Sequence, residues 1–219
     1  MKRISIITLA ITTIILSCKK EETSSEIAIE TNSTAYFPLN KGSFWVYEHR
    51  KIDSNGTDEP YSLMLDTIRV SRDTMIDGHI YTILEGRYAP FHTKPHQIVD
   101  MIRDSSGYLI SFNGEVLFAV ENFNRVLSKD TGFVNRDFWY YALTRRMKYS
   151  NAPLHVKAGS FQTIYDEGSV VFNPDVEVPY YERTMVTHYA RGVGKVMQRY
   201  FYSASPYTYE KRLVAYHIN

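Results

Sequence analysis

The chain of 219 residues carries 25 lysines and arginines against 24 aspartates and glutamates. The two signs are interspersed, so no basic stripe indicates a nucleic-acid partner. No linker rich in proline, serine or glycine divides the chain and no internal repeat is visible, which predicts one folded domain. The single cysteine excludes an intramolecular disulfide.

The N-terminal stretch MKRISIITLAITTIILSC places Lys2 and Arg3 before an apolar run that ends at Leu16-Ser17-Cys18. This run is too short for a membrane-spanning helix, which needs roughly 20 apolar residues. The stretch resembles the signal peptide and lipobox of a bacterial lipoprotein. The resemblance implies that residues 1–17 are removed, and that Cys18 becomes a lipidated N-terminus that attaches the protein to a membrane.

Four charged residues follow the cysteine: Lys19, Lys20, Glu21 and Glu22. They resemble the lysine-then-acidic export signal of Bacteroidota surface lipoproteins, which implies an outer-membrane protein at the cell surface. The alternative is a lipoprotein that faces the periplasm, since any tether is rich in charge. Residues 18–35 contain few sizeable apolar groups, which predicts a disordered tether after the lipidated cysteine.

Residues 36–219 have the composition and turn signals of a single all-β domain. The chain has 18 tyrosines and 11 phenylalanines, which suit a pleated surface. Asp77-Gly78 and Asn113-Gly114 predict hairpins with type I′ turns. We expect strands at residues 43–51, 61–72, 79–85, 96–103, 108–112, 115–121, 161–172, 184–191, 196–202 and 207–217.

Two segments are less regular. The apolar pattern slips by one residue near Asp66-Thr67, which predicts a β-bulge. In residues 137–149, Asp137 could cap a helix, but the aromatic side chains favour a strand. We therefore expect antiparallel meander hairpins that form a strongly curved sheet or partial barrel, with little helix outside the signal peptide.

Three stretches resemble a pattern of uncharacterised, mostly β, Bacteroidota-type surface or outer-membrane lipoproteins. They are YFPLNKGSFWVY at residues 36–47, AGSF at 158–161 and YARGVGKV at 189–196. The resemblance implies a fold and a compartment but no activity. Gly192 and Gly194 indicate tight turning or close approach of the backbone. The Gly-Val-Gly stretch does not match a phosphate-binding loop, because a third glycine and a following helix are missing.

No motif indicates catalysis, a metal or a cofactor. Pro95 separates His92 from His96 and argues against a helix that would place both on one face. The paired carboxylates Asp166-Glu167 and Asp175 with Glu177 are interpreted as turn and edge charges. A hydrolase with a site formed only in space stays an alternative.

Two Asp-Thr-aliphatic stretches, at residues 66–68 and 73–75, resemble O-glycosylation acceptors of the same bacteria. The resemblance implies glycosylation at Thr67 and Thr74; the alternative is that Asp-Thr pairs are common at strand ends.

These features favour a non-catalytic binding or accessory role at the envelope, with an envelope protein or an apolar ligand as partner. The first alternative is a carrier or sensor that holds an apolar ligand inside the curved sheet. The rings there would either line a cavity or fill the interior themselves. The side chains expected to face such a ligand are Trp45, Tyr47, Tyr81, Ile83 and Phe118.

Overall fold

The computed structural model describes residues 32–87, 97–121 and 123–219, and 66% of these residues lie in β-strands. The all-β prediction is confirmed. The elements are η1 (Ser33–Ala35), β1 (Phe44–Ile52), β2 (Asp58–Ile76), β3 (His79–Gly86), β4 (Gln97–Ser105), β5 (Tyr108–Ser111), β6 (Val116–Ala119), β7 (Val126–Asn135), β8 (Phe138–Tyr149), β9 (Leu154–Val156), β10 (Gly159–Phe161), β11 (Thr163–Phe172), β12 (Glu182–Ala190), β13 (Gly194–Tyr200) and β14 (Thr208–His217).

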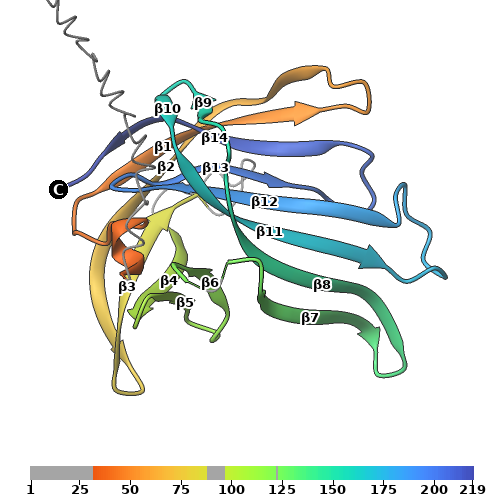
Figure 1. Cartoon of the computed structure of the whole chain (residues 1–219), viewed down its shortest axis with the longest axis horizontal. Coiled ribbons are helices and arrows are strands. Elements are labelled where there is room, and N and C mark those ends of the chain that lie inside the picture. The colour runs from red at the N-terminus through yellow and green to blue at the C-terminus, as the bar shows by residue number, and fades with distance from the viewer. Residues whose placement is uncertain (1–31, 88–96, 122) are drawn as a thin grey trace, which may run out of the picture.

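Twelve strands form one sheet in the order β6-β5-β4-β3-β2-β1-β14-β13-β12-β11-β8-β7. The sheet consists of two antiparallel meanders that join where β1 pairs with β14. It curls strongly, so that the end strands β6 and β7 lie near each other at the lower side of Figure 1. Strands β9 and β10 form a separate two-stranded ladder. The predicted partial barrel is therefore observed.

The turns agree with the sequence at one hairpin and differ at another. Asp77 and Gly78 have φ values of 49° and 78°, as a type I′ turn requires. The hairpin predicted at Asn113-Gly114 forms between β5 and β6, but the predicted type I′ turn was wrong, because only the glycine has a positive φ, 83°. Asn113 instead accepts a hydrogen bond from the backbone N–H of Glu115, and this local bond stabilises a longer loop. Ser106-Gly107 forms a further two-residue turn between β4 and β5.

The structure shows what the two irregular segments of the sequence form. Residues 138–149 form strand β8, as favoured, and pair with β7, which the sequence did not predict. Strand β7 was missed because it is mostly exposed and lacks an alternating apolar pattern. The expected irregularity in β2 lies just before Asp66, where Ser62 and Asp66 pair with His49 and Tyr47 of β1. The extra residues put Leu63 at the surface, 95% exposed.

The core is built largely from aromatic rings of the first and third sequence motifs. The rings of Phe37 and Trp45 lie 5.4 Å apart, and those of Phe118 and Tyr189 lie 4.8 Å apart. The indole Nε1 of Trp45 donates to the carbonyl of Val193 at 2.5 Å. Close approach at this point explains the YARGVGKV motif. A Cβ on Gly194 would lie 3.0 Å from Trp45 Nε1, and its φ of +102° favours glycine.

The folded domain begins earlier in the chain than composition indicated. Residues 33–35 were assigned to the tether, but they form η1. Ser33 is fully buried and its hydroxyl donates to Asp104, while the carbonyl of Ala35 accepts from the N–H of Gly192 at 2.7 Å. These contacts with distant strands compensate for the small apolar content of the segment.

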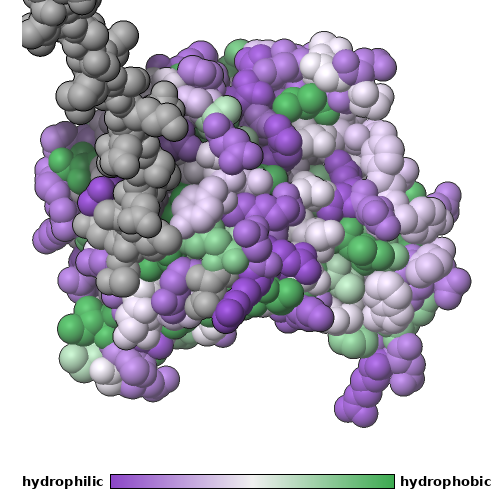
Figure 2. All heavy atoms as spheres, in the orientation of Figure 1, coloured by the Kyte–Doolittle hydropathy of each residue, from purple (hydrophilic) through white to green (hydrophobic). Residues whose placement is uncertain are grey.

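The surface carries both hydrophobic and hydrophilic side chains. Figure 2 shows hydrophobic side chains in small separate groups among hydrophilic ones on the face that it displays. In residues 32–87, 97–121 and 123–219 no helix is long and apolar enough to cross a membrane.

Candidate functional site: a charged cavity inside the sheet

Beside the aromatic core, the concave side of the sheet encloses a cavity of about 290 Å³ that we call the charged cavity. Its lining comes from both meanders, chiefly from β4, β8, β11, β12 and β13. A smaller hollow of about 150 Å³ adjoins it and shares three lining residues with it. The shared residues are Asp100, Lys195 and Gln198.

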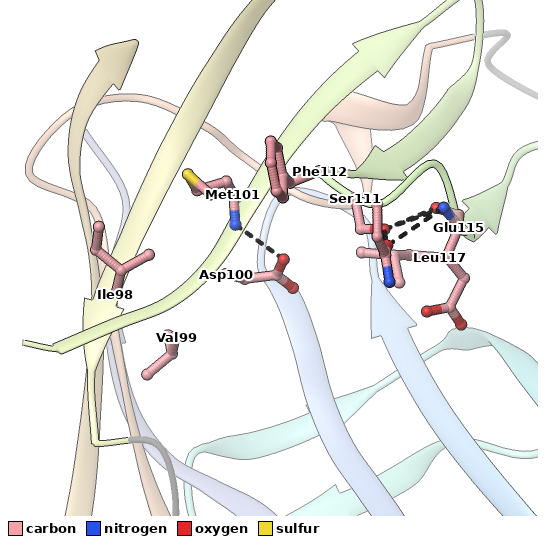
Figure 3. A pocket seen from close by; sticks show the side chains of 9 residues that line it. Ile98, Val99, Asp100, Met101, Ser111, Phe112, Glu115 and Leu117 are labelled. Atoms are coloured by element: carbon pink, nitrogen blue, oxygen red, sulfur yellow. Dashed lines mark hydrogen bonds between the residues drawn. The ribbon is translucent and has the colours of Figure 1, made fainter. Parts of the chain in front are cut away.

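A shallow groove of about 470 Å³ leads along β4 and the loop between β5 and β6. Figure 3 shows Asp100 in the middle of this groove, between Ile98 and Val99 on one side and Glu115 and Leu117 on the other. Asp100, Glu115 and Leu117 line both the groove and the charged cavity. The two spaces therefore adjoin at these carboxylates.

Arg145 is the central buried cation of the cavity wall. Its Nη2 lies 2.7 Å from a carboxylate oxygen of Asp166, and its Nη1 lies 2.5 Å from Glu115. The same guanidinium donates to the carbonyls of Val116 and Leu117 in β6, both at 3.0 Å. One side chain thus joins β8 and β11 to the end strand β6, using the five donors that arginine offers in a plane.

Asp166 had been interpreted from the sequence as a turn or edge charge, and that interpretation was wrong. It lies within β11, buried at 6% exposure. Burial raises its pKa, and the adjacent Arg145 opposes this effect. A sequence signal was present, since Ile164, Asp166 and Val170 occupy alternate positions that a strand directs to one face.

Lys195 and Asp100 are half-buried, and they differ from Arg145 because neither has a direct counter-ion among the described residues. In the described part of the chain, the Nζ of Lys195 makes no hydrogen bond or ion pair. Desolvation lowers the pKa of Lys195 to about 8, and the positive charge of Lys211 contributes to this decrease. The carboxylate of Asp100 accepts a hydrogen bond from the N–H of Met101 at 2.9 Å. Burial raises the pKa of Asp100, and the more distant Lys195 opposes this. Both charges remain poorly compensated.

A second set of buried charges lies behind the smaller hollow. Asp66 accepts from His49 Nε2 at 2.8 Å and from Lys211 Nζ at 3.2 Å. Burial opposes ionisation of Asp66, but its two donors hold its pKa below the usual value. Asp66 and His49 are 1% and 2% exposed, so these two side chains have no access to a ligand, whereas Lys211 lines the smaller hollow.

The five side chains expected to face a ligand do not share one site. Trp45 and Tyr47 border the smaller hollow, while Phe118 is fully buried between Tyr36 and Tyr189. Tyr81 and Ile83 alternate along β3 with Leu84, which belongs to the main core, so they lie on the opposite side of the strand.

An aromatic pocket that the sequence did not indicate lies farther along the same strands. It has a volume of about 250 Å³ and includes Tyr140, Tyr141, Phe172 and Phe201. It adjoins the charged cavity, because Leu143 and Met185 line both.

The remaining positions singled out in the sequence are the glycosylation, lipidation, export and histidine residues. Thr67 and Thr74 are half-buried within β2. Cys18, Lys19, Lys20, Glu21 and Glu22 lie outside the described residues, as do His92 and His96. In the part of the chain that the structure describes, no group of three or more His, Cys, Asp or Glu side chains could hold a metal ion.

No protein-family model matches the chain, and no curated protein matches it in sequence. Two solved structures are similar in outline. A proposed exported protein with a YmcC-like fold from Bacteroides fragilis has 10% identity and a TM-score of 0.45, covering 83% of this chain and 98% of its own. A proposed lipoprotein from Parabacteroides distasonis has 12% identity and a TM-score of 0.42, with the same coverage of 83% and 98%. We base no inference on likenesses this weak.

Proposed function

We propose that this protein is a lipid-anchored lipoprotein of the bacterial envelope, and that its β domain binds a small polar ligand in the charged cavity. The observation that carries the binding role is the half-buried Lys195, which has no direct counter-ion among the described residues and lines the same cavity as Asp100. Anchoring rests on the sequence, where Cys18 ends an apolar run. Placement at the cell surface rests on Lys19, Lys20, Glu21 and Glu22.

The energetic reason for a binding role is that buried charges are destabilising unless they are paired. A protein retains such groups where function requires them, and strongly perturbed pKa values concentrate at functional sites. The charged cavity, at about 290 Å³, lies at the small end of the range of roughly 300 to 1,000 Å³ for ligand pockets. A compact polar molecule fits these properties better than a large apolar one.

Binding without catalysis is favoured over hydrolysis by the chemistry of the lining. The described residues that line the charged cavity include no serine, cysteine or histidine. Two of its carboxylates, Glu115 and Asp166, are engaged by Arg145. Among the described lining residues, no serine or cysteine nucleophile is therefore paired with a histidine base, the arrangement that many hydrolases use.

The anchor is tested by detergent phase partitioning of the wild type and of Cys18→Ala. Two or more acyl chains hold a protein stably on a membrane, so the wild type should enter the detergent phase and the variant should not. Fatty-acid label that persists on Cys18→Ala would contradict lipidation at this residue.

The membrane face is tested by changing Lys20, Glu21 and Glu22 together to alanine. Digestion by protease added to intact cells should decrease, whereas the matched triple change of Thr23, Ser24 and Ser25 to alanine should leave it unaltered. A wild-type protein that is already protected from the protease faces the periplasm, and the export interpretation then fails.

Ligand binding is tested with the mature lipoprotein in detergent. Melting temperatures are measured with sugars, organic acids, amino acids and inorganic phosphate. At least one class should raise the melting temperature of the wild type and of the exposed control Lys157→Met, but not that of Lys195→Met. If no class has an effect, or if the effect persists in Lys195→Met, the cavity is not the binding site.

A second candidate, the carriage of an apolar ligand, is favoured by the aromatic pocket around Phe172 and Phe201. Native mass spectrometry should then show a bound apolar mass that Phe201→Ala removes and Lys195→Met retains.

A further inference from the structure

Lys195 and Asp100 face one cavity from opposite sides of the curved sheet. Lys195 lies on β13 and Asp100 on β4, and four strands separate these in the sheet order. Curvature of the sheet brings both residues to the lining of the charged cavity and of the smaller hollow. Gln198 lines both spaces as well and supplies an uncharged amide.

The remaining charges that line the charged cavity already have partners among the described residues. Arg145 is paired with Asp166 and Glu115. Outside this group, Lys211 is paired with Asp66, and Arg199 with Glu210. Among the described residues that line the charged cavity, Lys195 and Asp100 are thus the two charges without a direct counter-ion, and they are of opposite sign. Arg87 lines only the smaller hollow.

We infer that the ligand is a small zwitterion of the size of an α-amino acid. Its anionic group would contact Lys195 and its cationic group would contact Asp100. A ligand with a single charge would compensate one of these residues and leave the other half-buried and without a counter-ion, which is less favourable. Gln198 can donate a further hydrogen bond to the anionic group. This inference rests on the proposed function and specifies its ligand class.

The chemistry of α-amino acids allows a direct test, because each charge can be removed separately. The N-acetyl derivative keeps the carboxylate alone, and the amide keeps the ammonium group alone. Titration calorimetry of the mature lipoprotein with a panel of α-amino acids, with their N-acetyl derivatives and with their amides compares the three. We expect at least one amino acid to bind tenfold or more tightly than both of its derivatives.

Variants assign each charge to its residue. In Lys195→Met the preference for the amino acid over its amide should disappear, and in Asp100→Asn the preference over the N-acetyl derivative should disappear. The exposed controls Lys157→Met and Asp137→Asn should retain both preferences. If Lys195→Met does not fold, Lys195→Gln serves in its place because it keeps a polar side chain of similar length.

The outcomes separate this inference from the function on which it rests. Equal binding of an amino acid and one of its derivatives would overturn the zwitterion and leave a polar-ligand site in place. Failure of every polar compound to bind would overturn both. Binding of an amino acid that persists when Lys195 and Asp100 are both replaced would locate the site elsewhere and contradict the inference.

Discussion

Replacing Lys195 by methionine should stabilise the folded protein at pH 7, because the native lysine is a partly desolvated cation without a direct counter-ion among the described residues. Burial lowers its pKa from 10.5 to about 8. Each unit corresponds to about 1.36 kcal/mol between the two protonation states. The protonated Lys195 therefore destabilises the folded state relative to the unfolded state by about 3 kcal/mol at most. Water in the cavity would reduce it to roughly 2 kcal/mol.

The pH dependence follows from the sign of this shift. Between pH 8 and 10.5 the unfolded chain keeps the proton on Lys195 while the folded protein loses it. The free energy of unfolding of the wild type therefore rises with pH across this window. Methionine removes the penalty at every pH. The advantage of Lys195→Met should be full below pH 8 and should vanish near pH 10.5.

The assays are urea denaturation and thermal unfolding, both followed by circular dichroism, at pH 7, 8.5 and 10. At roughly 2 to 4 °C per kcal/mol for a domain of this size, the melting temperature at pH 7 should rise by about 4 to 12 °C. The charges near Lys195 are Asp100, Arg145, Asp166 and Lys211. Because burial also lowers the pKa of Lys211, the quantity compared is the difference between variant and wild type.

Two results would refute this reasoning. Lys195→Met could be no more stable than the wild type at pH 7, or its advantage could stay constant up to pH 10. The exposed control Lys157→Met should change stability by less than about 0.5 kcal/mol at each pH.

Three further predictions concern stability. Arg145→Met should lower the free energy of unfolding by about 3 to 5 kcal/mol, because Asp166 is left buried without its counter-ion. In urea denaturation, the additional change Asp166→Asn should recover part of this free energy. A double variant with no recovery would contradict the pairing. Gly194→Ala should cost about 1 to 3 kcal/mol and change the tryptophan fluorescence, since φ is +102° and a Cβ would lie 3.0 Å from Trp45 Nε1. The lowered pKa of Asp66 contributes stability above its unfolded value of 3.8, which is lost as the pH falls through the folded value. Denaturation midpoints of Asp66→Asn should therefore depend less on acid pH than those of the wild type.

The sequence by itself determined the features that depend on neighbouring residues. Alternating apolar and aromatic side chains indicated most strands, including β8, because side chains of a strand point alternately to its two faces. The positive φ that Asp77-Gly78 tolerates determined one hairpin. The lipidation of Cys18 is a prediction of the same local kind, read from a short contiguous pattern.

Tertiary structure decided what depends on strands that are distant in the sequence. Lys195 and Asp100 belong to different meanders, and the curl of the sheet alone brings them to one cavity. Asp166 was misread because the adjacent Glu167-Gly168 resembles a turn, whereas the pairing of β11 with β8 buries it beside Arg145. Burial and charge pairing are non-local, since they depend on which strands become neighbours when the sheet closes.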